Sequence, residues 1–197
     1  MSRKLVLAAA LAAFAAPAFA QATDGPGPNL VIEVAGQANG TVVIDLLPDV
    51  APQHVAQIVA LAKEGAYDNV VFHRVIDGFM AQTGDVQYGK ATGDLSQAGT
   101  GGSSKPDLPA EFSDLSYTRG VVGMARSQDP NSANSQFFIM FTDGVDVDGQ
   151  RRLYDEVLKG AYTVVGNVVS GMDVVDAIQR GEPPATPDVM TRVTVQE

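Results

Sequence analysis

Cysteine is absent from this chain of 197 residues, and so is tryptophan. Without cysteine the protein has no disulfide, no thiolate metal site and no cysteine nucleophile. Positive charge is scarce, because 13 Lys and Arg residues stand against 23 Asp and Glu residues and leave a formal net charge of −10. An acidic surface repels nucleic acid and anionic lipid, so we expect neither as a partner. No cluster of metal ligands and no phosphate-binding loop stands out in the sequence, and we expect no cofactor.

Long apolar runs are lacking too, except at the N-terminus. Arg3 and Lys4 precede an apolar run over residues 5–16, and Pro17-Ala18-Phe19-Ala20 follows it. This order is typical of a secretory signal peptide, and we expect cleavage after Ala20. A membrane anchor is the alternative, but the run is short and rich in alanine. The sequence therefore predicts a signal peptide over residues 1–20, a periplasmic or secreted protein, and no membrane span after cleavage.

The rest of the chain is predicted to be one domain behind a short linker. Residues 21–29 are rich in Pro and Gly and indicate a flexible linker. The chain is 45% hydrophobic, so residues 30–197 suffice for a single core. Strand-like patterns occur on both sides of Asn39-Gly40 and Asp77-Gly78, which are hairpin signals, and further along the chain. The expected strands are residues 30–34, 41–47, two runs within 70–85, 121–125, 136–141, 163–169 and 189–195.

Two helices are predicted among these strands. The first begins near residue 49 or 50, has Pro52 in its first turn and ends at Gly65. Its apolar stripe comprises Val55, Ile58, Val59 and Ala62. His54 lies beside this stripe and is expected to face solvent. The second helix covers residues 172–179, with Ser170 as its cap.

Two polar segments are expected to lack regular structure for most of their length. Residues 88–109 form a long loop with five glycines, and a loop of this length inside a compact domain is more often functional than idle. Residues 143–162 are expected to be irregular, with a short helix near residues 153–158.

The most informative stretch is residues 70–85, Val-Val-Phe-His-Arg-Val-Ile-Asp-Gly-Phe-Met-Ala-Gln-Thr-Gly-Asp. A cation, an aromatic ring, a thioether and an amide lie within nine positions on the two arms of a predicted hairpin. Such a mixture is typical of a half-apolar pocket for a small ligand or a peptide.

This stretch resembles the strongest signature of the cyclophilin-type peptidyl-prolyl isomerases. Asn134-Ser135-Gln136-Phe137-Phe138-Ile139 resembles a second signature, and Gly120-Val121-Val122-Gly123-Met124-Ala125 lies between them in the family's order. The resemblance covers residues 30–197. It implies a mainly β fold, a closed eight-stranded antiparallel β-barrel capped by two α-helices. A barrel of eight strands is filled by its own side chains, so the site is expected on the outer wall.

The resemblance also implies the site residues. Arg74 matches the catalytic arginine, Phe79, Met80 and Phe138 match the proline pocket, and Gln82 and Gln136 match the amides beside it. Backbone groups near Ala125 and Arg126 would hold an extended substrate. We predict that Tyr162 and Val147 lie at the rim of the pocket. The segment Gly99-Thr100-Gly101-Gly102 is expected to be a backbone turn near that rim.

The chemistry implied is rotation about an X-Pro bond, which breaks no covalent bond. The barrier is roughly 20 kcal/mol because resonance gives the C–N bond partial double-bond character. A donor that binds the twisted amide better than the planar one accelerates the step. The arginine guanidinium is a multi-donor fork that stays protonated at any working pH.

Each residue also has a purely structural interpretation. Arg74 could be an ordinary surface arginine, Phe79 and Phe138 core aromatics, and Met80 a gap-filler. His73 could act as an acid or base, but a satisfied core histidine is the expected role.

The match to the family has gaps. Thr83 stands where many cyclophilins have glycine, and residues 150–161 form an insertion. Many members place a tryptophan on the pocket rim, which this chain lacks, so we predict weak cyclosporin binding.

The sequence is compatible with two functions. The first is an exported isomerase, expected to be a monomer, that acts on proline-containing peptides and unfolded exported proteins. The second is a binding module, or holdase, that grips proline-containing segments with little turnover.

Overall fold

The structure is a computed structural model that describes residues 22–197. The predicted signal peptide lies outside the described residues. Within them the chain forms eleven strands, three α-helices and one 3₁₀ turn. The strands are β1 (Asn29–Ala35), β2 (Gly40–Leu46), β3 (Val70–Val71), β4 (Arg74–Ile76), β5 (Met80–Thr83), β6 (Val121–Met124), β7 (Phe137–Met140), β8 (Gly144–Val147), β9 (Gln150–Leu153), β10 (Val164–Ser170) and β11 (Val189–Gln196). The helices are α1 (Pro52–Lys63), α2 (Asp155–Leu158) and α3 (Met172–Ala177), and the 3₁₀ turn is Leu95–Gln97.

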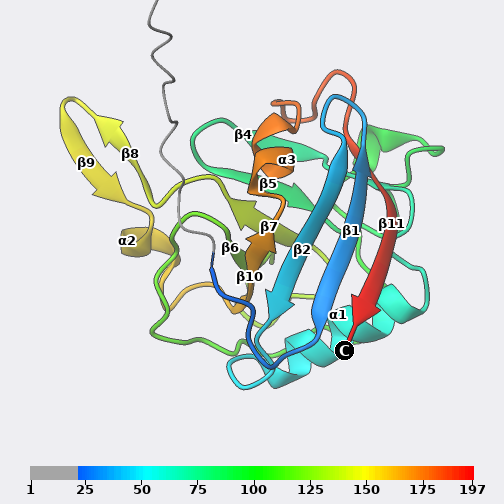
Figure 1. Cartoon of the computed structure of the whole chain (residues 1–197), viewed down its shortest axis with the longest axis horizontal. Helices are drawn as coiled ribbons and strands as arrows, with labels where there is room; N and C mark the ends of the chain where they lie inside the picture. The colour runs from blue at the N-terminus through cyan, green and yellow to red at the C-terminus, as the bar shows by residue number, and fades with distance from the viewer. Residues whose placement is uncertain (1–21) are drawn as a thin grey trace, which may run out of the picture.

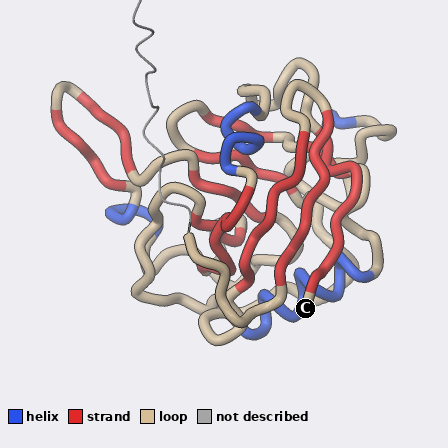
Figure 2. Tube along the Cα trace, in the orientation of Figure 1, coloured by secondary structure: helices blue, strands red, loops and turns tan. Residues whose placement is uncertain are grey.

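Nine of these strands form one curled antiparallel sheet (Figures 1 and 2). Its order is β3-β11-β1-β2-β10-β6-β7-β5-β4. The first and last strands in this order, β3 and β4, are separated in the chain only by Phe72 and His73. Counted as two halves of one broken strand, they make eight strands that return to their start. The mainly β, barrel-like fold with few helices is therefore confirmed, with a strand count that depends on how this break is treated.

Strand alternation divides the apolar side chains between two clusters. In β6 and β7, Val122, Met124, Phe137 and Ile139 belong to the barrel core. The residues between them on the same strands, among them Val121, Phe138 and Met140, belong to a second cluster on the outer wall. Successive side chains of a strand point to opposite faces, so one continuous apolar sequence fills the core and leaves an apolar patch outside.

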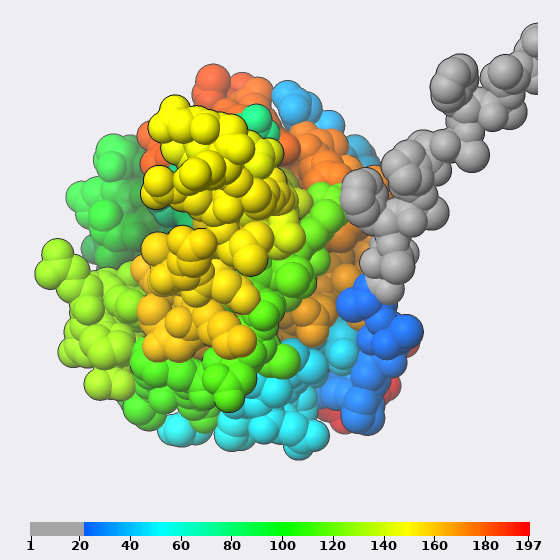
Figure 3. Space-filling view, turned by 90° about the vertical axis from the view of Figure 1, so that its left-hand side faces the viewer, coloured from blue at the N-terminus to red at the C-terminus, as the bar shows by residue number. Residues whose placement is uncertain are grey.

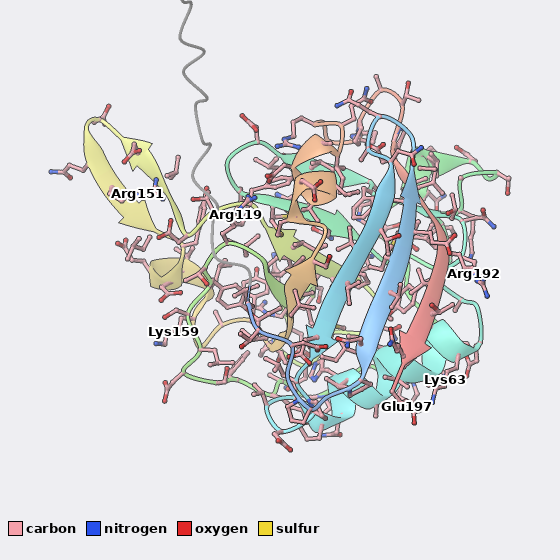
Figure 4. The ribbon with its side chains drawn as sticks, viewed as in Figure 1. Lys63, Arg119, Arg151, Lys159, Arg192 and Glu197 are labelled. Carbon is pink, nitrogen blue, oxygen red and sulfur yellow. The ribbon has the colours of Figure 1, made fainter. Side chains whose placement is uncertain are left out.

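Helices α1 and α3 pack against the sheet near opposite ends of its strands (Figure 1). Pro52 occupies the first turn of α1, as predicted, and Gly65 follows its end with φ of +69°. The Lys63 ammonium donates to the Glu197 carboxylate at 2.7 Å and joins the end of α1 to the C-terminus (Figure 4).

His54 corrects the expectation of a solvent-facing side chain. It is 0% exposed, and its Nδ1 lies 2.6 Å from Oε2 of Glu111. Glu111 also accepts hydrogen bonds from the backbone N–H groups of Gln53 and His54, in place of a capping side chain in the helix itself. These hydrogen bonds outweigh the cost of burying the Glu111 carboxylate and hold its pKa below its ordinary value.

Two further expectations about helix α3 were wrong. Ser170 does not cap it: the N-cap position belongs to Gly171, which has φ of +85° and makes no side-chain cap. The helix ends at Ala177, because Ile178 already has extended backbone and is buried in the core. An apolar residue at this position stabilises the structure by packing inward rather than by extending the helix.

The segment after β7 is more regular than expected. Residues 143–162 hold the hairpin β8–β9 and the short helix α2, and the hairpin forms a separate two-stranded sheet. The turn is Asp148-Gly149, and both residues have positive φ, of 50° and 77°. Two-residue hairpin turns of type I′ require this conformation at both positions, which Asp-Gly pairs tolerate well.

The long loop after β5 is tied down by one buried carboxylate. Asp85 is 0% exposed. Its Oδ1 accepts from the backbone N–H groups of Gln87 and Tyr88, and its Oδ2 accepts from those of Gly99 and Gly101, at 2.7 to 3.0 Å. The glycine turn of this loop is thereby held against the sheet, next to the site described below.

Candidate active site

The hairpin β4–β5 brings the predicted catalytic and binding residues together. In its register Arg74 is opposite Gln82, and Ile76 is opposite Met80. Gly78 has φ of +67° in the connecting turn, which puts Phe79 beside the strand end. Directly paired residues share a face of the sheet, so Arg74, Gln82 and Met80 all project from the same wall.

One pocket of about 230 Å³ lies on this wall, and we name it the Arg74 pocket. Eight of the nine predicted site residues line it. Its lining comprises Arg74, Phe79, Met80, Gln82, Ala125, Arg126, Phe138, Leu158 and Tyr162. The ninth predicted residue, Gln136, lines an adjoining hollow that shares Gln82, Ala125 and Arg126 with the pocket.

The floor of the Arg74 pocket is the ring of Phe138, which lies over Gly123 on the neighbouring strand. A Cβ atom on Gly123 would lie 2.5 Å from Cζ of Phe138 and 2.9 Å from Cε1 of Tyr117. The rings of Tyr117 and Phe138 are stacked, with centroids 5.9 Å apart and planes 19° apart. Only glycine therefore lets the Phe138 ring lie down on the sheet and leave space above it.

The far wall is Tyr162, which Arg126 holds in place. The Tyr162 ring meets Phe138 edge-on at 5.9 Å between centroids. The Arg126 guanidinium lies 4.3 Å from the Tyr162 centroid and donates to the carbonyls of Ala161 and Ser127 at 2.8 to 3.0 Å. Most N–H donors of Arg126 are therefore used within the pocket wall.

A chain of amides connects the pocket to the glycine turn and determines how Gln82 is oriented. Gln136 Nε2 donates to the carbonyls of Gly99 and Gly101 at 3.0 and 2.7 Å. With both its N–H groups used, Gln136 accepts at Oε1 from Gln82 Nε2 at 2.9 Å. The Gln82 carbonyl oxygen must then face Arg74, whose Nη1 lies 3.5 Å away. The glycine turn thus lies at the edge of the site, as the resemblance implied.

Arg74 keeps donors free where Arg126 does not. Its Nε donates to the Glu182 carboxylate at 3.3 Å, and its Nη1 makes the long contact to Gln82. Both side chains of the Arg74–Glu182 pair are about half exposed, so the pair contributes little to stability. A guanidinium has five N–H donors, and three of those on Arg74 remain available to a ligand in the pocket.

His73 lies behind this site. It is 5% exposed and so is a core residue, as expected, but neither ring nitrogen makes a hydrogen bond of good geometry among the described residues. Burial lowers the pKa of His73, although the Asp85 carboxylate nearby opposes that shift. The ring lines a separate hollow on the other side of Arg74 and Gln82, and it does not line the Arg74 pocket.

Two residues beside the pocket are not predicted from the sequence, and one predicted rim residue lies elsewhere. Leu158 lines the pocket, and Tyr154 packs its ring 4.5 Å from that of Phe79 and donates to the Gly78 carbonyl at 2.7 Å. Both belong to the insertion, for which the family resemblance supplies no template. Val147, guessed at the rim, is instead 37% exposed on β8 and is not among the lining residues.

The unusual Thr83 fits the fold without disturbing the site. It is 0% exposed, and its hydroxyl donates to the Val71 carbonyl at 2.9 Å. This hydrogen bond joins β5 to β3 across the break between β3 and β4. The threonine is therefore a structural link that satisfies its own buried hydroxyl.

Comparison with known proteins places this chain in one family. Residues 30–196 match the family model described as cyclophilin type peptidyl-prolyl cis-trans isomerase/CLD. The chain belongs to the cyclophilin-type peptidyl-prolyl cis-trans isomerases.

Among its relatives is a probable peptidyl-prolyl cis-trans isomerase of Brucella suis, 50% identical over 201 residues, which span 98% of this chain and 96% of that protein. Peptidyl-prolyl cis-trans isomerase B of Escherichia coli is 39% identical over 142 residues, or 72% of this chain and 79% of that one. The crystal structure of the cyclophilin AquaCyp293 from Hirschia baltica superposes with a TM-score of 0.65 and 25% identity, over 87% of this chain and 74% of the other.

Two further features of residues 22–197 bear on partners. No helix in this part of the chain is long and apolar enough to cross a membrane. No group of three or more His, Asp or Glu side chains is arranged there to hold a metal ion. Cyclophilin isomerases act on proline-containing peptides, and the Arg74 pocket is the concave, half-apolar site suited to such a ligand.

Proposed function

We propose that this isomerase accelerates X-Pro rotation by seating the proline ring on Phe138 and donating from Arg74 to the twisted amide. In the twisted state the prolyl nitrogen regains its lone pair and becomes pyramidal, so it accepts a hydrogen bond that the planar amide does not. A donor fixed beside the ring therefore binds the transition state better than the ground state. The observation that carries the proposal is that, of the two arginines in the pocket, only Arg74 keeps most of its donors free.

Magnitudes show that Arg74 does not act alone. A 10⁵-fold acceleration requires about 7 kcal/mol off the barrier. One charge-assisted hydrogen bond supplies about 1.5–3 kcal/mol. The remainder comes from holding one side of the X-Pro bond while the other rotates in a partly dry site. Phe79, Met80 and Phe138 hold the ring, and the Gln82–Gln136 amides together with the backbone near Ala125 hold the preceding residues.

The geometry also explains why His73 is left out of this mechanism. Its ring is buried on the far side of the Arg74–Gln82 pair, and it has no access to a proline in the pocket. A buried imidazole with a lowered pKa is neutral at working pH and contributes no charge to the rotating amide.

A protease-coupled isomerisation assay on a short X-Pro peptide tests the proposal. Arg74→Ala should lose about 10- to 150-fold in kcat/KM, while peptide affinity measured by calorimetry changes only a few-fold. Arg126→Ala is the matched control, because it removes an arginine of the same pocket and should mainly weaken binding by releasing Tyr162. A holdase would instead show little turnover in the wild type and unchanged suppression of aggregation in Arg74→Ala.

We further propose that the clients are unfolded exported proteins, that the site of action is the periplasm, and that the enzyme is monomeric. The support for export to the periplasm is the order of charges, apolar residues and small residues at the N-terminus. Expression of the full chain in a Gram-negative host, followed by fractionation and N-terminal mass measurement, tests this. A mature protein beginning at Gln21 in the periplasmic fraction is expected, and an uncleaved chain in the cytoplasm would contradict it.

A further inference from the structure

The hairpin β8–β9 and helix α2, together named the arm, stand out from the barrel as a separate unit (Figures 1 and 3). In the space-filling view the yellow hairpin projects toward the viewer above α2. All its strand residues but Gly144 are exposed. A lone two-stranded hairpin buries little, so it contributes little to the stability of the domain.

The composition of the arm does not match its exposure. Among residues 22–197 six large hydrophobic side chains are exposed, and four of these lie in the arm. They are Val145 at 40%, Val147 at 37%, Leu153 at 45% and Val157 at 64%. Solvent-facing hairpins usually carry polar and charged residues, which prevent unwanted pairing. A concentration of apolar side chains on a projecting element therefore indicates a binding surface.

The two faces of the hairpin differ. On one face the Arg151 guanidinium forms ion pairs with the carboxylates of Asp143 and Asp146. On the other face Val145 is opposite Arg152 and Val147 is opposite Gln150. The Arg152 side chain has no ion-pair or hydrogen-bond partner within the described part of the chain. This face therefore presents two exposed valines, Val145 and Val147, beside the polar side chains of Arg152 and Gln150.

The base of the arm is part of the Arg74 pocket. Tyr154, between β9 and α2, packs on Phe79 and is bonded to Gly78, and Leu158 of α2 lines the pocket. A polypeptide with its proline in the pocket therefore leaves the site beside the arm. Val145 and Val147 lie on β8, which is paired with β9, the strand that leads into this base.

We propose that the arm is a docking surface for the segment of client polypeptide that flanks the bound proline. The segment is an extended, unfolded chain with apolar side chains at alternate positions, matching Val145 and Val147, which are two residues apart on one strand. The unpaired outer edges of β8 and β9 offer backbone groups to such a chain. This inference rests on the proposed function, because it takes the proline to be in the Arg74 pocket.

Two double variants test the arm. Val145→Thr with Val147→Thr keeps strand propensity and side-chain shape while making the face polar. Val31→Thr with Val43→Thr is the matched control, because these valines are paired, partly exposed residues on β1 and β2. The probes are a four-residue X-Pro peptide, a 20-residue unfolded peptide with the same centre and flanking valines, and a reduced ribonuclease whose refolding is limited by proline isomerisation.

The arm variant should turn over the four-residue peptide at the wild-type rate and bind the 20-residue peptide about 5- to 20-fold more weakly. Its catalysis of ribonuclease refolding should fall by a similar factor, and the control variant should change neither. Equal losses on both peptides, or none on the long one, would overturn the proposal. So would a wild-type dimer in sedimentation that the arm variant dissociates, since a second copy would then be the occupant. Failure of the proposed function is distinguishable, because the wild type would not turn over the four-residue peptide.

Discussion

Gly123→Ala tests most sharply whether strand β6 has one face in the pocket and the other in the core. The added methyl group would lie 2.5 Å from Cζ and 3.0 Å from Cε1 of Phe138. Carbon atoms prefer separations of about 3.5–4.0 Å, so the ring must shift by about 1 Å. The space it can enter is the Arg74 pocket of about 230 Å³, because Tyr117 is stacked against the same Phe138 ring and would itself lie only 2.9 Å from the added methyl group. The proline would then be displaced from the Arg74 donors.

A displacement of about 1 Å in a reacting group can cost on the order of 100-fold in rate, so we expect kcat/KM to fall by about 10- to 100-fold. Overpacking should also lower the free energy of unfolding by about 1–3 kcal/mol. The control is Val122→Ala, one residue earlier on β6, which faces the barrel core and should cost about 2 kcal/mol with kcat/KM unchanged. The assay is protease-coupled isomerisation, with urea unfolding alongside. Equal losses of kcat/KM in the two variants would refute the division of β6 into a core face and a pocket face.

Three further predictions concern pH and inhibition. Because a guanidinium group stays charged at any working pH and His73 is outside the mechanism, kcat/KM should be constant within about twofold from about pH 5.5 to about pH 8.5. A sigmoid that follows protonation of an imidazole and vanishes in His73→Gln would assign the reaction to His73 instead. Burial lowers the pKa of His73, so below about pH 6.5 the unfolded chain binds a proton that the folded chain does not. The contribution of His73 to the free energy of unfolding is therefore largest above that pH and should fall as the pH decreases, by up to about 1.4 kcal/mol per pH unit. The fall should be less steep in His73→Gln. Urea unfolding at about pH 7.5 and about pH 5.5 checks this, and the same pH dependence in both proteins would contradict it. Cyclosporin should inhibit only weakly, in the micromolar range, because Tyr162 stands at the rim without a tryptophan; nanomolar inhibition in the isomerisation assay would show that the missing indole is unimportant.

Local sequence patterns predict those elements of the barrel whose structure depends on interactions between residues close together in the chain. Alternating apolar residues and an Asp-Gly pair predict the hairpin β4–β5, and the 3.6-residue period with Pro52 predicts α1. In both elements the deciding interactions lie within a few residues. Closure of the sheet is predicted only by the family resemblance, because β3 and β4 meet only if all the strands between them in the sheet pair correctly.

The misses share a physical cause, which is contact between distant segments. His54 is buried because Glu111, 57 residues away, covers it, and nothing on α1 itself signals this. The hairpin β8–β9 carries the usual Asp148-Gly149 turn, but its charged strands hide the alternation that identifies buried strands. From that same insertion Leu158 lines the pocket and Tyr154 packs on Phe79 beside it. A local pattern gives no indication of where such an insertion folds back.

The measurement that tests the central claim most directly is the isomerisation rate of an X-Pro peptide bound at saturation, obtained by NMR exchange spectroscopy for the wild type and Arg74→Ala. At saturation the rate reports the rotation step on the enzyme and is insensitive to affinity. A 10- to 150-fold slower exchange in Arg74→Ala is expected if a charge-assisted hydrogen bond of about 1.5–3 kcal/mol is formed only in the twisted state. Exchange at the wild-type rate in the saturated variant would contradict any role of the Arg74 guanidinium in rotation.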